Sequence, residues 1–370
     1  MKKIVFMLTL LVAAVGAEAK YWKIGPGSVA GMDFASINAA MESASVNGGD
    51  TLYLDQYYST TGQQTITKKI VIIGTGYDTS LTDEQVVATI GGLNIKADDV
   101  TVKSVKLGSV CFYNSNCTID RCYANSINVG AVIEGFNHIY SSVLYGTSAK
   151  SVIDGAFVSQ NITYSSRFDI QNCVIEHSFS YSDKDYTYSM DGTIKNLELS
   201  IIRNNVIYRN EDVRYTDNRN YYALMGISNT IITNNYIFGY QYYYHNGIYK
   251  GYEQDISTYV LSVNSGNTIE HNILSRSSLS NFPANKIGYN SRSSIFVCSG
   301  SFSDYYRLLS SSPAHGYATD GGEVGCHGGM FGCPSGGRPQ YIPYFTKVTV
   351  GSRSEDGKLP VSVTIKIQDE

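Results

Sequence analysis

One pattern of apolar and polar residues recurs through the middle of the chain. It places an isoleucine three residues before a small or amide residue, as in IIRNN (201–205), IITNN (231–235) and TIEHN (268–272). The aligned isoleucines are Ile119, Ile139, Ile170, Ile202, Ile232 and Ile269. The residues three positions later are Cys122, Ser142, Cys173, Asn205, Asn235 and Asn272. Successive copies are 20 to 37 residues apart, a spacing that indicates a repeat architecture.

A repeat of this length with no helical pattern inside it predicts that each copy is one coil of a parallel β-helix. Stacked isoleucines would fill the core, and stacked asparagines would hydrogen-bond to one another from coil to coil. Asparagine also tolerates the left-handed backbone conformation of a tight turn. We therefore expect an all-β solenoid with an asparagine ladder. The alternative is a β-sandwich with asparagine-rich turns, which would not keep isoleucine and asparagine in one register.

Both ends of the chain depart from the repeat. Residues 33–47 predict a helix with Asp33 as N-cap, an apolar face that includes Ile37 and Met41, and a stop at Gly48. Such a helix would cover the first coil. Residues 341–370 include an alternating apolar segment, VSVTIKIQ (361–368), which predicts a terminal β-hairpin or small sheet. We therefore divide the mature chain into a solenoid over residues 20–340 and a β appendage over 341–370.

The start of this solenoid resembles a known superfamily. The order Phe34-x-x-Ile37-x-x-Ala40, then GDTLYL (49–54) and TITKKIVIIGTG (65–76), is similar to the opening of pectin-lyase-like right-handed β-helices. Residues 308–332 similarly resemble the closing coil of secreted bacterial β-helix proteins. One departure is Gln56 before Tyr57 and Tyr58, where the superfamily usually has glycine. The resemblance implies a right-handed coil, but it implies no single activity, because this scaffold carries many.

The first 19 residues predict export. Two lysines precede an apolar run over residues 4–15, and Ala17-Glu18-Ala19 follows, which is the order of a secretory signal peptide. The run is too short to span a bilayer, so we expect a secreted, periplasmic or cell-surface protein without a transmembrane segment. The net charge of −4 without a basic cluster argues against nucleic acid as a partner. Oligomeric state is not indicated by any pattern.

Seven cysteines are consistent with export. In an exported chain we expect one or two local disulfides and several buried thiols. Cys326 and Cys333 form the pair to test first. Together with His327 and His315 they are also candidate metal ligands, although their spacing matches no structural zinc pattern.

Inserted segments follow three successive copies of the repeat at the same phase, over residues 180–192, 210–220 and 239–254. Coils that stack would place these segments on one side of the solenoid. Residues 180–255 hold 14 of the 31 tyrosines. Tyrosine suits sugar rings because it offers both a flat apolar face and a hydroxyl group. The candidate residues for binding a polysaccharide or cell-surface glycan are Tyr186, Tyr188, Tyr215, Tyr242, Tyr243, Tyr244 and Tyr249.

A plainer interpretation of these tyrosines is that they serve as β-formers on the outside of a polar solenoid. The same segments contain charged residues that would suit cleavage of an acidic glycan by β-elimination. That reaction needs a cation to neutralise the uronate and a base to remove its α-proton. Candidate catalytic residues are Arg203, Arg214, His245, Lys250 and Glu253. The sequence establishes no cofactor, but Ca²⁺ is a candidate, with Glu211, Asp212 and Asp217 as its candidate ligands.

No spacing among these charged residues is diagnostic, and charged residues in solvated loops ordinarily have no catalytic role. The sequence thus supports two classes of function. The first is an exported β-helix protein that binds an acidic polysaccharide and also cleaves it as a lyase or glycoside hydrolase. The second is a non-catalytic adhesin, glycan-binding or structural protein.

Overall fold

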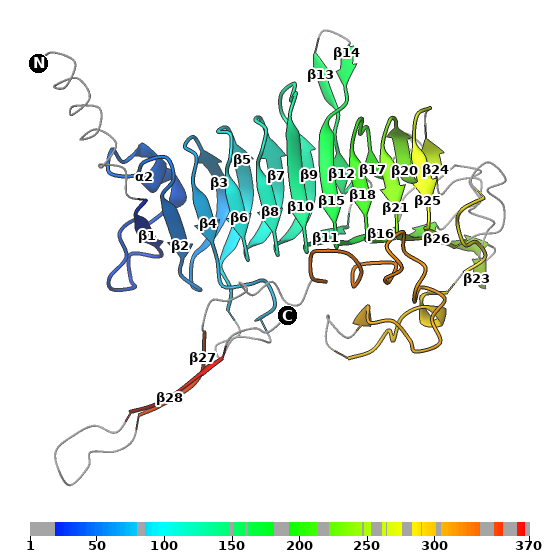
Figure 1. The fold of residues 1–370 in the computed structure, drawn as a ribbon. Helices are drawn as coiled ribbons and strands as arrows, with labels where there is room; N and C mark the ends of the chain where they lie inside the picture. The colour runs from blue at the N-terminus through cyan, green and yellow to red at the C-terminus, as the bar shows by residue number, and fades with distance from the viewer. Residues whose placement is uncertain are drawn as a thin grey trace, which may run out of the picture.

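The chain forms long stacks of parallel strands in a computed structural model (Figure 1). The structure describes residues 19–79, 86–147, 151–159, 162–180, 192–213, 222–245, 248–252, 261–263, 265–275, 283–289, 291–300, 305–333, 344–350 and 361–366. The predicted signal peptide lies outside this set apart from Ala19. Among the described helices, none is long and apolar enough to cross a membrane.

Among the described residues, ten short strands make up sheet A, each paired in parallel with the strand of the next coil. In spatial order they are β1 (Tyr21–Ile24), β2 (Thr51–Leu54), β4 (Val71–Ile73), β6 (Thr101–Lys103), β8 (Thr118–Asp120), β10 (Phe136–Tyr140), β15 (Arg167–Gln171), β18 (Ile201–Arg203), β21 (Ile231–Thr233) and β25 (Thr268–Glu270). Order along the sheet follows order along the chain, as stacked coils require.

In the part of the chain that the structure describes, sheet B has fourteen strands and divides into two branches after β9. The first four are long and single: β3 (Ser59–Ile66), β5 (Thr89–Ile95), β7 (Lys106–Phe112) and β9 (Tyr123–Val129). After β9 one branch contains β11 (Val143–Gly146), β16 (Val174–Ser180), β19 (Val206–Val213), β22 (Tyr236–His245), β23 (Ile248–Tyr252) and β26 (Ile273–Leu274). The other contains β12 (Ile153–Asp154), β17 (Gly192–Lys195), β20 (Tyr222–Ile227) and β24 (Leu261–Val263).

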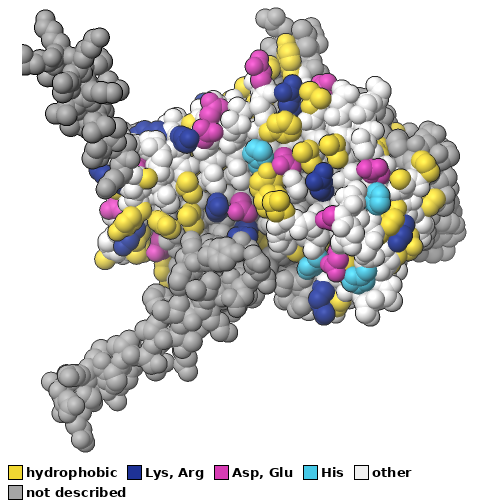
Figure 2. Space-filling model, viewed as in Figure 1, with side chains coloured by type: hydrophobic (Ala, Val, Ile, Leu, Met, Phe, Trp, Pro, Cys, Tyr) yellow, Lys and Arg dark blue, Asp and Glu magenta, His cyan; other side chains and the backbone are white. Residues whose placement is uncertain are grey.

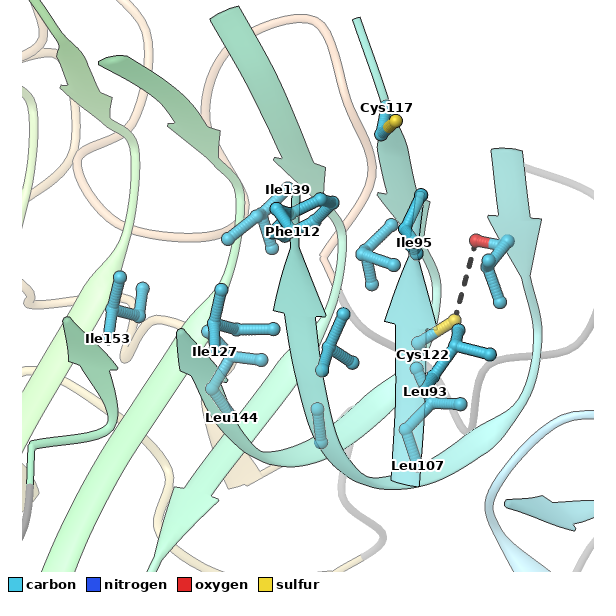
Figure 3. Close-up of a cluster of buried hydrophobic side chains, with 14 of the residues drawn as sticks. Leu93, Ile95, Leu107, Phe112, Cys117, Cys122, Ile127, Ile139, Leu144 and Ile153 are labelled. Carbon is cyan, nitrogen blue, oxygen red and sulfur yellow. Dashed lines mark hydrogen bonds between the residues drawn. The ribbon is translucent and has the colours of Figure 1, made fainter. Parts of the chain in front are cut away.

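The predicted isoleucine column is confirmed by the strand register of sheet A. Ile119, Ile139, Ile170, Ile202, Ile232 and Ile269 pair successively across β8, β10, β15, β18, β21 and β25. The same column continues toward the N-terminus through Trp22, Leu52, Ile72 and Val102. A parallel row on sheet B, which includes Leu107 and Leu144, faces this column across the core (Figure 3).

The asparagine ladder is also present, at the turn that joins sheet A to sheet B. Asn205 N–H donates to Asn235 Oδ1 at 2.9 Å, Asn235 N–H to Asn272 Oδ1 at 2.9 Å, and Asn272 N–H to Asn285 Oδ1 at 3.0 Å. Each of the side chains of Asn205, Asn235 and Asn272 is fully buried. Where the column holds cysteine, the thiol instead reaches a carbonyl, as between Cys122 Sγ and Val102 O (Figure 3).

One part of the prediction for the turn is wrong. The left-handed backbone belongs to the residue before each ladder asparagine, with φ of 56° at Asn204 and 61° at Asn234. The ladder asparagines themselves are not left-handed. Their amides are selected for hydrogen bonding between coils, whereas the preceding position is selected for its backbone conformation.

The predicted helix is shorter than expected. Helix α2 covers Ile37–Glu42, and its N-cap is Ser36, which accepts a hydrogen bond from Ala39 N–H at 3.1 Å. Asp33 cannot cap it because its carboxylate accepts from Lys23 N–H instead, at 2.8 Å. Ile37 and Met41 do belong to the core, as the apolar pattern predicted.

Residues 308–332 also differ from the prediction. Residues 308–332 do not form a closing coil; they consist almost entirely of turns and bends. The last partial coil lies earlier, where Lys286 N–H donates to Asn272 O and Asn285 takes the ladder position. Further on, β27 (Tyr344–Val350) and β28 (Val361–Lys366) pair as an antiparallel hairpin. Another antiparallel pair, β13 (Phe157–Ser159) with β14 (Ile162–Tyr164), projects from the coils (Figure 1).

The ladder predicts a specific loss of stability. Replacing Asn235 by Ala should lower the free energy of unfolding by about 2–4 kcal/mol, because Asn205 N–H and the Ile202 carbonyl would lose buried partners. The matched control is Asn47→Ala, which removes one exposed hydrogen bond to Ser45 and should cost less than about 0.5 kcal/mol. Urea unfolding measures both, and equal costs in the two variants would contradict the ladder's role.

Candidate functional site

The inserted segments leave sheet B on a continuous extension of its strands. Asp212 pairs with Tyr242 and Val213 with Tyr243 where β19 and β22 run side by side. Beyond them β23 folds back on β22, so that Tyr244 pairs with Tyr249. We call the backbone of residues 178–180, 210–213, 239–245 and 248–252 the sheet extension. Its register makes Tyr244 and Tyr249 neighbours on two adjacent strands.

The structure locates the predicted site residues unevenly. The backbones of Glu211, Asp212, Tyr242, Tyr243, Tyr244, His245, Tyr249 and Lys250 lie on the sheet extension. Tyr186, Tyr188, Arg214, Tyr215, Asp217 and Glu253 lie outside the described residues. Arg203 is elsewhere: it ends β18 on sheet A, where its Nε donates to Thr233 Oγ1 at 3.3 Å. The structure therefore does not bring Arg203 together with the other candidates.

Two buried polar residues lie where the extension leaves the core. His177 and Arg209 are neighbours in the register of β16 and β19, and both are almost fully buried. Arg209 Nη1 donates to Tyr222 O at 3.0 Å, and His177 Nδ1 lies 3.5 Å from Thr193 Oγ1. The guanidinium gives the base of the extension a fixed positive charge. The sequence pattern does not distinguish these two from surface residues of the same strands.

A second group of polar side chains crosses coils on the outer face of sheet A. Tyr140 OH donates to Asp169 Oδ2 at 2.6 Å and lies 2.7 Å from His138 Nδ1. Gln171 Nε2 donates to the other carboxylate oxygen at 2.8 Å. We call His138, Tyr140, Asp169 and Gln171 the outer polar cluster. In the space-filling view, basic, acidic and histidine side chains are interspersed over the middle of the molecule (Figure 2).

The electrostatics of the outer polar cluster favour an ionised Asp169 and a neutral Tyr140. Burial raises the pKa of Asp169, but hydrogen bonds from His138, Tyr140 and Gln171 outweigh it and lower that pKa below its usual value. Burial, with the hydrogen bond to Asp169, raises the pKa of Tyr140 far above its usual value. Tyr140 therefore stays a neutral phenol near neutral pH and cannot act as a phenolate base.

The sequence holds a signal for this cluster in the residues that flank the aligned isoleucines. His138 and Asp169 each directly precede an aligned isoleucine, and Tyr140 and Gln171 each directly follow one. Residues flanking an inward isoleucine point outward on a strand, so the alignment alone places all four on neighbouring outer positions.

The outer face of sheet B carries a third polar group, beneath the C-terminal segment. Glu176 is paired with Arg292, whose Nη1 lies 3.2 Å from Oε1, and the Tyr306 hydroxyl also donates to this carboxylate. The Arg292 guanidinium stacks over the Tyr208 ring at 3.9 Å. Burial raises the pKa of Glu176, and the charge of Arg292 partly offsets that rise. These contacts join two chain segments that pack in a second apolar cluster, so we assign them to structure.

Among the described residues, one group has the composition and proximity of a metal site. Single ligand atoms of Cys326, His327 and Cys333 all lie within 4.8 Å of one another. Of the predicted Ca²⁺ ligands, Asp217 lies outside the described residues, and Glu211 and Asp212 are described by their backbones alone.

Comparison of the chain with protein-family models, with curated proteins and with solved structures gives no match. The fold alone therefore defines the class: the chain is an all-β protein whose stacked parallel strands are consistent with a parallel β-helix.

The outer polar cluster predicts a defined pH dependence. The pKa of Asp169 is lower in the folded state than its unfolded value of about 3.9, so its stabilisation is complete above about pH 5. It is lost as the pH falls through the folded pKa. The stability difference between the wild type and Asp169→Asn should therefore be largest near neutrality and shrink below about pH 4.

Thermal unfolding at pH 3 to 8 measures this difference. Asp99→Asn is the matched control, because Asp99 makes an exposed ion pair with Lys69 and its left-handed backbone also suits asparagine. A difference for Asp169→Asn that is independent of pH would contradict the assignment.

Proposed function

We propose that this chain is an exported, right-handed β-helix protein of the pectin-lyase-like type that binds an acidic polysaccharide along the sheet extension. The observation that carries the proposal is the register that aligns Asp212 with Tyr242 and Tyr244 with Tyr249. It supports a tyrosine-rich surface built from regular strands, which are more rigid than isolated loops.

The dimensions of this surface fit an extended polymer. Neighbouring strands lie about 4.8 Å apart, so positions on successive strands recur at roughly the length of one sugar residue. Aromatic side chains at such positions can stack on the C–H faces of sugars while their hydroxyls reach ring substituents.

Cleavage is the second function that a specific observation favours. Lys250 pairs with Tyr243 in the hairpin of β22 and β23, and His245 pairs with Ile248 at its end. A cation and a titratable imidazole are therefore two positions apart on adjacent strands, which is the pair of groups that β-elimination from a uronate requires. A non-catalytic adhesin would use the same tyrosines without this chemistry.

Binding tests the proposal directly. The mature protein should bind one of pectin, alginate or a glycosaminoglycan, as measured by affinity electrophoresis or calorimetry. Replacing Tyr242, Tyr243 and Tyr244 by Ala should weaken that binding at least about tenfold, because about 1.4 kcal/mol of lost stacking suffices for this.

The matched control is Tyr21→Ala with Tyr53→Ala. These two tyrosines are 68% and 41% exposed and lie on the first two strands of sheet A, away from the extension. Equal loss of binding in the control, or no binding by the wild type to any of these glycans, would rule the proposal out.

Cleavage has its own measurement. A lyase releases unsaturated uronides, which absorb in the ultraviolet, and this absorbance should vanish in His245→Ala and Lys250→Ala while glycan binding persists. Binding by the wild type with neither absorbance nor new reducing ends would assign the protein to the non-catalytic class.

A further inference from the structure

Residues 312–333 run across the stacked coils and do not add another coil to the stack. Residues 312–333, which we call the strap, follow the column of left-handed turns between sheets A and B. Thr319 exchanges two hydrogen bonds with the Asn234 side chain, at 2.9 and 3.0 Å. Further along, Asn172 Nδ2 donates to Cys326 O at 2.8 Å. The turn asparagines therefore bind the strap through its backbone and through the Thr319 hydroxyl group.

The end of the strap reaches the outer polar cluster. The Phe331 ring stacks on the Tyr140 ring with centroids 4.0 Å apart and planes 10° apart. Tyr140 is the residue that bridges His138 and Asp169. Any contact that fixes the last loop of the strap therefore also fixes the Phe331 ring over the outer polar cluster.

That last loop begins at Cys326 and ends at Cys333. Both sulfur atoms and one imidazole nitrogen of His327 lie within 4.8 Å of one another. Cys326 is buried, Cys333 is partly exposed and His327 is exposed. Gly325 and Gly329, with φ of 96° and 76°, allow the tight turn that brings the two cysteines together.

The other buried cysteines have different surroundings. The thiols of Cys117, Cys122 and Cys173 donate to backbone carbonyls within the core, at 3.3 to 3.5 Å. They complete the hydrogen bonding of turns between coils, as serine and asparagine do elsewhere in the stack. Cys326 is also buried, but it lies beside Cys333, which is partly exposed and within reach of an oxidant.

We propose that Cys326 and Cys333 form an intrachain disulfide that closes the last loop of the strap and fixes Phe331 on Tyr140. The oxidant is a second disulfide, carried by a protein or small-molecule thiol–disulfide exchange partner. A disulfide needs its sulfurs about 2.0 Å apart, so side-chain rotation within the glycine-containing loop must close the remaining gap.

The order of the two exchange steps follows from burial. Cys333 is the accessible thiol, whereas Cys326 is fully buried. Cys333 therefore reacts first: its thiolate attacks the oxidant to form a mixed disulfide and displaces one thiolate, which takes up the proton that Cys333 gave up. Cys326 then loses its proton and attacks Cys333 Sγ, which releases the second thiol. The two cysteines lose two electrons and two protons, and the oxidant gains both.

Peptide mapping of the wild-type mature chain, purified from an oxidising compartment without reductant, tests the cross-link. The expected result is one linked peptide pair, containing Cys326 and Cys333, with a mass two hydrogens below that of the reduced peptides. Hydrogen exchange over residues 326–333 should become faster after reduction, and the midpoint of thermal unfolding should fall by a few degrees.

Variants separate this disulfide from other effects of reductant. Cys326→Ala with Cys333→Ala should abolish the effect of reductant on thermal unfolding, whereas Cys298→Ala, a partly buried thiol of the same C-terminal region, should retain it. The proposal is overturned if both thiols are alkylated without prior reduction, or if Cys326 is linked to Cys173. A stoichiometric zinc ion that a chelator removes would overturn it too, since the same three residues would then be metal ligands.

Discussion

Hydrogen bonding between successive coils is the constraint on which the rest of this structure depends. A parallel stack buries a turn in every coil, and each buried turn leaves N–H and carbonyl groups that must find partners. The amides of Asn205, Asn235, Asn272 and Asn285 satisfy these groups along one side. A second series does so on the other side of sheet A, where Ser200, Thr230 and Asn267 accept from the backbone of the preceding coil. Because both series fix the register, residues about thirty positions apart become neighbours.

That register explains why the surface features lie where they do. Once Ile139 and Ile170 are paired in the core, His138 and Asp169 must lie side by side outside it. Once Val206 and Tyr236 are paired, the longer strands β19 and β22 must continue together, which produces the sheet extension. The candidate sites are thus consequences of core packing. Insertions after the same strand of each coil can then vary without disturbing the stack.

The sequence predicted the parts of this fold that repeat, because a repeat converts local spacing into three-dimensional neighbours. The isoleucine column, the ladder and the common origin of the insertions all followed from one alignment. The first coils were harder to align, since Trp22, Leu52, Ile72 and Val102 share neither a residue type nor a marking amide. Nothing local showed that Asp33 binds Lys23 N–H instead of capping the helix.

The prediction of a closing coil over residues 308–332 is wrong for a related reason: most of this segment belongs to the strap. Its glycine-rich segments resemble turns between strands, and only contacts with distant residues such as Asn172 and Asn234 show that it runs across the coils. The outer polar cluster was predictable in principle, but it required applying the isoleucine alignment to the flanking residues. The pairing of Glu176 with Arg292 was not predictable, because it joins segments 116 residues apart that share no pattern.

A crystal structure of the mature protein soaked with an acidic oligosaccharide tests the central claim most directly, namely that coil register builds the binding surface. The account predicts density for sugar rings over the paired strands β19, β22 and β23, with Asp212 opposite Tyr242. Sugar density confined to another face, or a register in which these two residues are not neighbours, would contradict it.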